Sequence, residues 1–516
     1  MKKIFFIIPV LCCSVILFAQ EPADALRYSW TTQSGTARQQ AIGGAMGALG
    51  GDVSATFTNP AGLGFYKTGD FVISPGFNFV NNKSTYYNTK TSDNKSSFAL
   101  GTTGFVLGWG GSNSSRKVKG TAFSIAVNRM ADFNSNILYK GSQNQNSYSQ
   151  KFLEEIQNNN DKDANNVASG YPYGTSLAFN TYWIDTVGGG SSGNYQFQTR
   201  APIATGLLQQ NTISAKGGVT EVAFAGAGNI NDKFYYGITL GVPFLNYKRT
   251  SEFLEADATS NADNKFNYAA ISESLHTSGV GLNLKAGIIF KPVESLRVGL
   301  AVHSPTYYSL EDKYSTSVTA DTEGYNGVLT QSSSDLLPEN DDHFKYTLLT
   351  PYRIIASAAY VLHGVEDVSQ QRGFITADVE YINYKASSFH TDPGNETNDN
   401  TTKNYLKDLN KAIDNAYKGA VNIRLGGELK FTKYMVRLGA AYYGNPYKDI
   451  NGEKGNNLQL TGGLGYRNKG IFVDLAYVHN MKKDINSPYR LQYAAYKNAD
   501  IKGTVGNVLL TIGFKI

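Results

Sequence analysis

The residues of this chain most suited to covalent chemistry lie between Gly189 and Gly193. The sequence there, GGSSG, matches the G-x-S-x-G pattern of a serine nucleophile elbow. Such an elbow needs a strand before the serine and a helix after it, because the sharp turn between them exposes the hydroxyl. This motif lies in a glycine- and serine-rich stretch without either pattern at its flanks. We interpret it as loop.

Histidines and carboxylates offer no better candidate for a reactive site. The six histidines are scattered, and no two have the spacing of metal ligands: His276, His303, His343, His363, His390 and His479. Acidic pairs such as Asp341-Asp342 and Glu154-Glu155 lie in polar stretches that water should reach. The sequence therefore predicts no metal site, no cofactor and no enzyme activity.

The first twenty residues, MKKIFFIIPVLCCSVILFAQ, have the features of a secretory signal peptide. Two lysines precede an apolar run from Ile4 to Phe18, which is shorter than the roughly 20 residues of a membrane-spanning helix. We expect residues 1–19 to be removed by cleavage near Ala19. Both cysteines, Cys12 and Cys13, lie in this segment, so the exported chain would have no disulfide and no thiolate metal site.

Composition narrows the class of protein further. Charged residues make up 17% of the 516 residues and aromatic residues 12%, with 53 glycines, 34 tyrosines and a mean hydropathy of −0.31. Without Lys2 and Lys3 the formal charge falls from +5 to about +3, which gives no reason to expect a nucleic-acid partner. No later apolar run approaches the length of a membrane-spanning helix. An exported chain of this kind is typical of outer-membrane β-barrels.

From Phe71 onward, apolar and polar residues alternate with period two, as in VNIRLGGELKF (Val421 to Phe431). We predict about fourteen strands: 71–80, 97–109, 120–133, 217–229, 233–255, 275–291, 295–317, 345–363, 371–387, 418–431, 433–444, 456–467, 469–480 and 503–515. Long connections alternate with short ones. The long ones are 81–96, 134–216, 256–274, 318–344, 388–417, 445–455 and 481–502.

This asymmetry predicts the fold class, an all-β transmembrane antiparallel β-barrel of about 14 strands. Outer-membrane barrels have an even number of strands, tight periplasmic turns and long extracellular loops. Several predicted strands exceed the 9–11 or so residues that cross the hydrocarbon, so the wall should project beyond the membrane. The longest loop, 134–216, has helical spacing in KFLEEIQ (Lys151 to Gln157) and GTSLAFNTYWID (Gly174 to Asp185). It could fold over the barrel mouth or pack on its own neighbours.

Residues 20–70 do not alternate and contain ARQQAIGGAMGALGGDVSATF. The small residues Gly43, Gly47 and Gly51 would let this segment pack in a narrow space. We expect residues 71–516 to form the barrel and residues 20–70 to be a separate segment before it.

The glycine-rich run, DVSAT (Asp52 to Thr56) and the Asn59-Pro60-Ala61 triplet just before the first strand resemble the FadL/TodX-type outer-membrane transporters of fatty acids and hydrophobic compounds in Gram-negative bacteria. The resemblance covers most of the exported chain. It continues through HSPTYYSLEDKYS (His303 to Ser315), TPYRIIASAAYVL (Thr350 to Leu362), TADVEYINYKAS (Thr376 to Ser387), VRLGAAYYGNPY (Val436 to Tyr447) and GGLGYRNKGIFVDLAYVHN (Gly462 to Asn480).

The resemblance implies a fourteen-stranded barrel in the outer membrane of a Gram-negative bacterium, plugged by an N-terminal hatch that carries an Asn-Pro-Ala motif. In this chain the hatch would be residues 20–70, inside the barrel of residues 71–516. It implies passive uptake of a hydrophobic ligand, which leaves sideways through a gap made by a kink in the third strand. In this chain that strand, TAFSIAVNRMADF, has no proline or glycine between Ala122 and Phe133. The sequence therefore does not locate the kink.

On this interpretation, Asn59, Pro60 and Ala61 form the turn that seats the hatch. Phe57, Leu63 and Phe65 would line an apolar ligand site beside it, gaining on the order of 25 cal/mol per Å² of apolar surface removed from water. They could instead only anchor the hatch to the wall. No basic cluster in the sequence marks a carboxylate site, so fatty acids, aromatic hydrocarbons and other lipophiles all fit.

We expect a monomer with a hydrophobic small-molecule ligand and outer-membrane lipid around it. A plugged lumen argues against a general porin. The alternative is a barrel of the same fold that acts as a protein-secretion shuttle or as a partner of surface proteins. The long loop 134–216 leaves that alternative open.

Overall fold

The computed structural model describes residues 20–30, 34–110, 117–187, 194–259, 261–338, 342–362, 372–394, 400–448 and 455–516. The predicted signal segment and the GGSSG motif at 189–193 lie outside these ranges.

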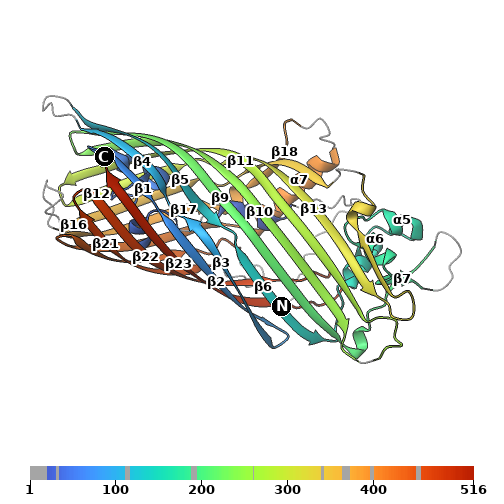
Figure 1. Ribbon diagram of the computed structural model, residues 1–516. Coiled ribbons are helices and arrows are strands. Elements are labelled where there is room, and N and C mark those ends of the chain that lie inside the picture. The colour runs from blue at the N-terminus through green and yellow to red at the C-terminus, as the bar shows by residue number, and fades with distance from the viewer. Residues whose placement is uncertain are drawn as a thin grey trace, which may run out of the picture.

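The described chain forms a closed antiparallel barrel of fourteen wall strands, as the sequence predicted (Figure 1). Six of these strands are each interrupted once along their length, so each carries two labels. The last strand pairs with both halves of the first, which closes the wall. In chain order the strands are β1 (Asp70–Ile73) with β2 (Pro75–Tyr86), β3 (Thr89–Leu100) with β4 (Thr103–Gly110), β5 (Val118–Asp132) with β6 (Ser135–Gln143), β9 (Leu207–Ile230), β10 (Phe234–Asp257), β11 (Tyr268–Val293), β12 (Leu296–His303) with β13 (Tyr307–Asp321), β15 (His343–Leu349) with β16 (Arg353–Leu362), β17 (Gly373–Asn383) with β18 (Ser388–Thr391), β19 (Gly419–Phe431), β20 (Tyr434–Tyr443), β21 (Asn457–Asn468), β22 (Ile471–Asn486) and β23 (Ala499–Lys515).

Side chains alternate between lumen and lipid along each strand, and β10 shows where the lipid-facing belt ends. From Phe234 to Phe244 its outward positions are exposed and apolar. Beyond Phe244 the outward positions are Asn246, Lys248 and Glu252. Water rather than lipid must surround that upper part, because charged side chains are costly in hydrocarbon. The wall thus extends past the membrane, as the strand lengths predicted.

The two ends of the barrel differ as expected. Short turns such as Asn231–Asp232 and the chain's C-terminus lie at one end, and the loops with helices lie at the other (Figure 1). In outer-membrane barrels the short-turn end faces the periplasm.

One predicted connection is wrong. Residues 81–96 are not a loop, because β2 and β3 continue as a hairpin to the two-residue turn Tyr87–Asn88, where both φ angles are positive. This hairpin stands above the lipid, so both of its faces are polar and period-two alternation is absent. For the same reason strands extend into the expected loops 134–216, 256–274 and 318–344.

The helices predicted in the longest loop are present as part of an extracellular cap. Helix α4 (Ser149–Asn158) and α6 (Thr175–Asn180) match the two predicted segments, and α5 (Ala164–Ser169) and the short hairpin of β7 (Ile184–Thr186) with β8 (Phe197–Thr199) lie between or after them. Trp183 and Leu177 are fully buried in this cap, which packs on β10 and β11. Helix α7 (Asn400–Ala416), in the loop 388–417, was not predicted.

No helix in the described ranges is long and apolar enough to cross a membrane.

The N-terminal segment lies inside the barrel. It consists of α1 (Pro22–Ser29), α2 (Ala37–Ala41), α3 (Ala55–Thr58) and the 3-10 helix η1 (Pro60–Phe65). Its hydrogen-bond partners come from strands all around the wall, from β9 to β23, so it can only occupy the lumen.

Candidate functional site

The Asn59-Pro60-Ala61 turn ties the luminal segment both to itself and to the wall. Pro60 begins η1 at a position where its missing N–H is not needed. The Asn59 side chain accepts from the Ala61 N–H (3.1 Å) and donates to the Gly47 carbonyl (2.6 Å) and to the Ile288 carbonyl of β11 (3.3 Å). One buried amide therefore joins the turn, the glycine-rich run and one strand of the barrel.

Inward-facing glycines of the wall let the luminal segment approach backbone to backbone. A Cβ atom at Gly426 would lie 2.2 Å from the Ile42 carbonyl oxygen, and one at Gly439 2.2 Å from the Gly43 nitrogen. Plug backbone blocks two further wall glycines in the same way, Gly237 by Pro60 and Gly299 by Gly47, and the Asn59 side chain blocks a third, Gly287. We call these five wall glycines the seat. The plug glycines could be recognised in the sequence, but their glycine partners in the wall could not, because those come from distant strands.

Hydrogen bonds complete the contact around the circumference. Wall side chains accept from the plug's backbone at Thr511 (from Ala37 N, 2.8 Å), Thr461 (from Gly43 N, 3.0 Å) and Asp378 (from Gly47 N, 3.1 Å). On the opposite side, Thr239 donates to the Thr56 carbonyl at 2.9 Å and Asn229 to the Gly64 carbonyl at 3.1 Å. The plug is fixed to the wall on all sides near the short-turn end.

The predicted ligand-contact residues all pack against the wall. Phe57 and Leu63 are buried in an apolar cluster with Val72, Val106 and alanines of β5 and β9. Phe65 stacks on Tyr235, with ring centroids 3.9 Å apart, and the Arg297 guanidinium lies 4.6 Å from its ring. None of the three lines the cavity described next. The packing favours the anchoring interpretation, and their contact with ligand stays a prediction.

A cavity of about 50 Å³ lies between helix α1 and the wall, on the extracellular side of the plug. One half of its lining is apolar or aromatic and the other half is polar. The apolar half includes Tyr28, Trp30, Met130, Ala131, Val219 and Tyr308, and the polar half includes Glu221, Asn283, Lys285, His303 and Arg353.

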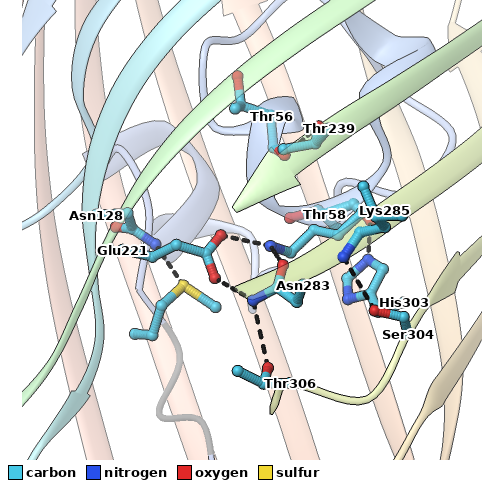
Figure 2. Close-up of polar contacts among 12 residues, drawn as sticks. Thr56, Thr58, Asn128, Glu221, Thr239, Asn283, Lys285, His303, Ser304 and Thr306 are labelled. Carbon is cyan, nitrogen blue, oxygen red and sulfur yellow. Dashed lines mark hydrogen bonds and ion pairs between the residues drawn. The ribbon is translucent and has the colours of Figure 1, made fainter. Parts of the chain in front are cut away.

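Within the polar half, Glu221, Asn283 and Lys285 form a connected network (Figure 2). Lys285 of β11 forms a buried ion pair with Glu221 of β9 and donates to the Asn283 side chain at 2.8 Å. Asn283 in turn donates to Glu221 at 3.0 Å, and the His303 ring nitrogen lies 2.9 Å from the Thr58 carbonyl of the plug. Buried charges of this kind are stable only when paired and hydrogen-bonded. The network therefore fixes the shape of the cavity floor.

Aromatic side chains of helix α1 close the cavity from above. Trp30, just after the helix, stacks on Tyr384, and Tyr28 donates to the Thr277 hydroxyl at 2.9 Å. Burial, followed by the nearby Asp24 and Asp312, raises the pKa of the Tyr28 hydroxyl well above its usual range. Tyr28 therefore stays protonated and keeps this hydrogen bond.

The wall beside the cavity is irregular. The ladder between β4 and β5 ends at the pair Thr103–Val127. Above that pair, no ladder in the described part of the chain joins β3 to β5 or β6. The third wall strand shifts register between Arg129 and Ala131 and breaks between Asp132 and Ser135.

The glycines that allow this break are on the neighbouring strand. Gly217 of β9 has φ +109°, and its carbonyl accepts from the Phe133 N–H at 2.9 Å. A Cβ atom at Gly218 would lie 2.1 Å from the Ala131 carbonyl oxygen. The third strand itself needs no glycine or proline, which is why its sequence did not reveal a kink.

Side chains replace the missing ladder. Thr91 of β3 donates to the Leu138 carbonyl at 2.5 Å, and the Lys95 ammonium lies 3.1 Å from the Asn136 side chain and 2.8 Å from the Ala215 carbonyl. We call this junction of β3 with β5 and β6 the seam. Met130 and Ala131 lie at its break and also line the cavity, so the cavity abuts the seam.

The chain matches no protein-family profile and no curated protein by sequence. Solved structures are similar. A FadL homologue from Pseudomonas aeruginosa aligns with a TM-score of 0.53 and 12% identity, over 94% of this chain and 99% of its own. The toluene transporter TodX from Pseudomonas putida aligns with a TM-score of 0.50 and 11% identity, over 94% of this chain and 99% of its own. At this identity the likeness shows the fold, and that fold is the FadL/TodX-type outer-membrane barrel that the sequence predicted.

Proposed function

We propose that this protein is a passive channel of the outer membrane of a Gram-negative bacterium, which takes up hydrophobic small molecules. The observation that carries the proposal is the position of the cavity, because Met130 and Ala131 belong both to its lining and to the break in the wall. A solute held there lies between a plug that blocks the axial path and the break in the wall, where the ladder from Ala131 through Val219 reaches Leu245 at the upper edge of the lipid-facing belt. Sideways release into the membrane is then the shortest route.

Aromatic side chains line the approach from the extracellular side. Tyr28, Phe133 and Tyr247 form a cluster with ring centroids 5.4 to 6.1 Å apart, beyond the end of the lipid-facing belt. Such rings provide apolar surface in a lumen that is otherwise polar. A polar-solute porin would gain nothing from them.

The size of the cavity means that the ligand must displace part of the protein. A volume of about 50 Å³ holds a few water molecules, at roughly 10–15 Å³ each by this measure, but not a long acyl chain. Helix α1 is the movable side, since the rest of the lining belongs to the wall. Its C-terminal end is held by the Arg353 guanidinium, which donates to the Ser29 carbonyl at 2.6 Å.

The polar half of the cavity favours an amphiphile with an anionic head. Lys285 and Arg353 together exceed the charge of Glu221, and the apolar half can take the first carbons of a chain. A fatty acid fits this arrangement, whereas a hydrocarbon would use only the apolar half. This pair could not be recognised in the sequence, because Lys285 and Arg353 come from different strands.

The test is binding of a fluorescent fatty acid to the refolded barrel, displaced by a fatty acid or by the alcohol of equal chain length. We expect saturable binding, and about a tenfold weaker displacement by the acid in Arg353→Met, since hydrogen bonds to charged groups contribute about 1.5–3 kcal/mol. The alcohol should change much less. A folded barrel that binds neither compound would contradict the proposal.

The alternative, a barrel that serves a protein partner, receives less support from the extracellular cap than the sequence suggested. Several large apolar residues of loop 134–216, including Leu177 and Trp183, are buried within the cap. They are therefore not offered to a partner. Absence of lipophile binding would restore this alternative.

A further inference from the structure

The short-turn end of the barrel has a charge unlike that of the rest of the chain. We define the rim as the described turns and strand ends at 67–70, 117–119, 230–234, 291–296, 372–373, 430–434, 467–471 and 515–516. It holds eleven of the 47 lysines and arginines but three of the 42 acidic residues, leaving thirty-six against thirty-nine elsewhere. The rim cations are Lys67, Lys117, Lys119, Lys233, Lys291, Arg372, Lys430, Lys433, Arg467, Lys469 and Lys515, and the acids are Asp70, Asp232 and Glu294.

Ion pairs within the rim neutralise little of this charge. Asp232 lies 3.8 Å from the exposed Lys67, and Glu294 pairs with Lys291 at 2.9 Å. Most of the other rim cations, including Lys233, Lys433 and Lys515, are exposed. The rim therefore presents a net positive surface that needs anions from outside the chain.

The rim cations lie beside lipid-facing aromatic and aliphatic side chains. Lys233 precedes Phe234, Lys433 precedes Tyr434 and Lys515 follows Phe514, and each of these rings is exposed on the outer wall. Lysines next to such residues lie at the level of lipid headgroups, where long basic side chains reach the interface. The cations are spread around the circumference instead of forming one patch, which suits lipid headgroups better than a docked protein.

A groove on the lipid-facing wall lies just above one part of the rim. It has a volume of about 570 Å³ across β9 to β12. Small outward residues, Gly226 and Ala286, form its floor, and Tyr236, Ile288 and Leu300 form its sides. A Cβ atom at Gly226 would meet nothing within 4 Å, so the floor is open.

We propose that the rim and this groove bind an anionic phospholipid of the periplasmic leaflet. One acyl chain would lie in the groove and the phosphate would contact Lys233. Lys233 lies in the turn just before β10 and is three residues from Tyr236, about 10 Å along an extended chain, which is a short step from acyl chain to headgroup. This site is on the outside of the wall, so it does not depend on what passes through the lumen.

Trp109 is a natural reporter for this lipid. It is 55% exposed on the outer wall, and its ladder partner Thr121 pairs in turn with Gly228 beside the groove. Two ladder spacings put it about 10 Å from β9. The other two tryptophans, Trp30 in the lumen and Trp183 in the cap, are away from lipid.

The experiment is quenching of Trp109 fluorescence by brominated lipid. The full exported chain is placed in phosphatidylcholine vesicles containing equal fractions of dibromo-phosphatidylglycerol or dibromo-phosphatidylcholine. We expect stronger quenching by phosphatidylglycerol at low salt, falling as salt rises. Lys233→Gln should reduce the preference by up to about fivefold, the effect of one lysine near an anionic surface.

Matched control variants distinguish binding at this lipid site from general effects of a substitution on quenching. Gly226→Leu fills the groove and should lower quenching by phosphatidylglycerol. Gly462→Leu, at an outward glycine of β21 with only ordinary contacts, should not. Lys497→Gln, at the opposite end of the barrel, should also leave the preference unchanged. Equal quenching by the two lipids in the wild type would overturn the proposal and favour an acidic protein partner for the rim.

Discussion

The seat and the seam are two junctions of the same barrel, and glycine has opposite effects in them. At the seat, Gly426 and Gly439 let the plug's backbone touch the wall's backbone, and buried side chains such as Asn59 and Thr461 add hydrogen bonds to this close contact. At the seam, Gly217 and Gly218 of β9 let the neighbouring strand break, and side chains such as Lys95 bridge what the ladder leaves unpaired. The first junction is fixed by its backbone and the second is held by side chains.

This difference indicates which junction can open. Each side-chain hydrogen bond at the seam contributes about 0.5–1.5 kcal/mol net, so a few of them can part at modest cost. Opening the seat would break many buried contacts around the circumference at once. This contrast supports the proposal that the axis stays closed while the wall opens beside the cavity.

Deletion of residues 21–56 should have the largest effect on the contrast between seat and seam. It removes most of the plug that packs against the seat. Every barrel ladder would remain, since no wall strand pairs with that segment. We expect the barrel to fold and to become permeable to sugars, measured by swelling of liposomes that contain it. Unchanged permeability would mean that the segment does not plug the lumen.

Locking the seam should have the next largest effect. The exported chain is predicted to lack cysteine, so Lys95→Cys with Asn136→Cys can be joined by a short thiol-reactive cross-linker. We expect uptake of a fluorescent fatty acid into proteoliposomes to fall more than tenfold, while binding to the barrel changes little. Reversal of the link should restore uptake.

The control for this lock is a cross-link across an intact ladder. Lys248 and His276 face each other on β10 and β11, above the lipid-facing belt. Joining cysteines at these positions should leave uptake unchanged. Equal losses in both cross-linked proteins would show that the seam is not the exit.

Much of the wall was predictable because lipid imposes a simple pattern. Period-two alternation in β10, β11 and β19 and the sorting of long and short connections identified the barrel and its strand number. The pattern failed where lipid is absent. The hairpin of β2 with β3 is polar on both faces. Helix α7 consists mostly of polar residues, although its buried Leu406, Leu409 and Ile413 have helical spacing.

The site was less predictable because its parts come from distant strands. Asn59 and Pro60 could be recognised as a turn from local sequence alone. The cavity floor joins Glu221, Lys285 and Arg353 from β9, β11 and β16, and the seam depends on glycines of a neighbouring strand. A single sequence shows neither the cavity floor nor the glycines beside the seam, since both arrangements depend on the register of strands in the closed barrel.

Filling one position of the seat should have a smaller effect than deleting the plug. In Gly439→Val the new side chain would collide with Gly43 and Ile42, and overpacking of this kind costs about 1–3 kcal/mol. We expect faster proteolysis of residues 34–66 and a measurable rise in ion conductance. Gly462→Val, on the outer face of the adjacent strand, is the matched control and should leave both quantities unchanged.

Pro60→Ala should have the smallest effect. It tests how much of the plug's attachment comes from the local turn and how much from contacts with the wall. Proline fixes φ at the first position of η1, and its loss should destabilise the local turn by about 0.4–1 kcal/mol. Hydrogen exchange of residues 57–66 should then rise while the barrel's unfolding temperature stays nearly constant, because Asn59 still holds the Gly47 and Ile288 carbonyls. A large drop in the unfolding temperature would mean instead that plug and wall unfold as one unit. In that case the contacts at the seat would contribute to the unfolding free energy of the whole barrel. The seat and the seam would then differ only in how strongly each junction is held.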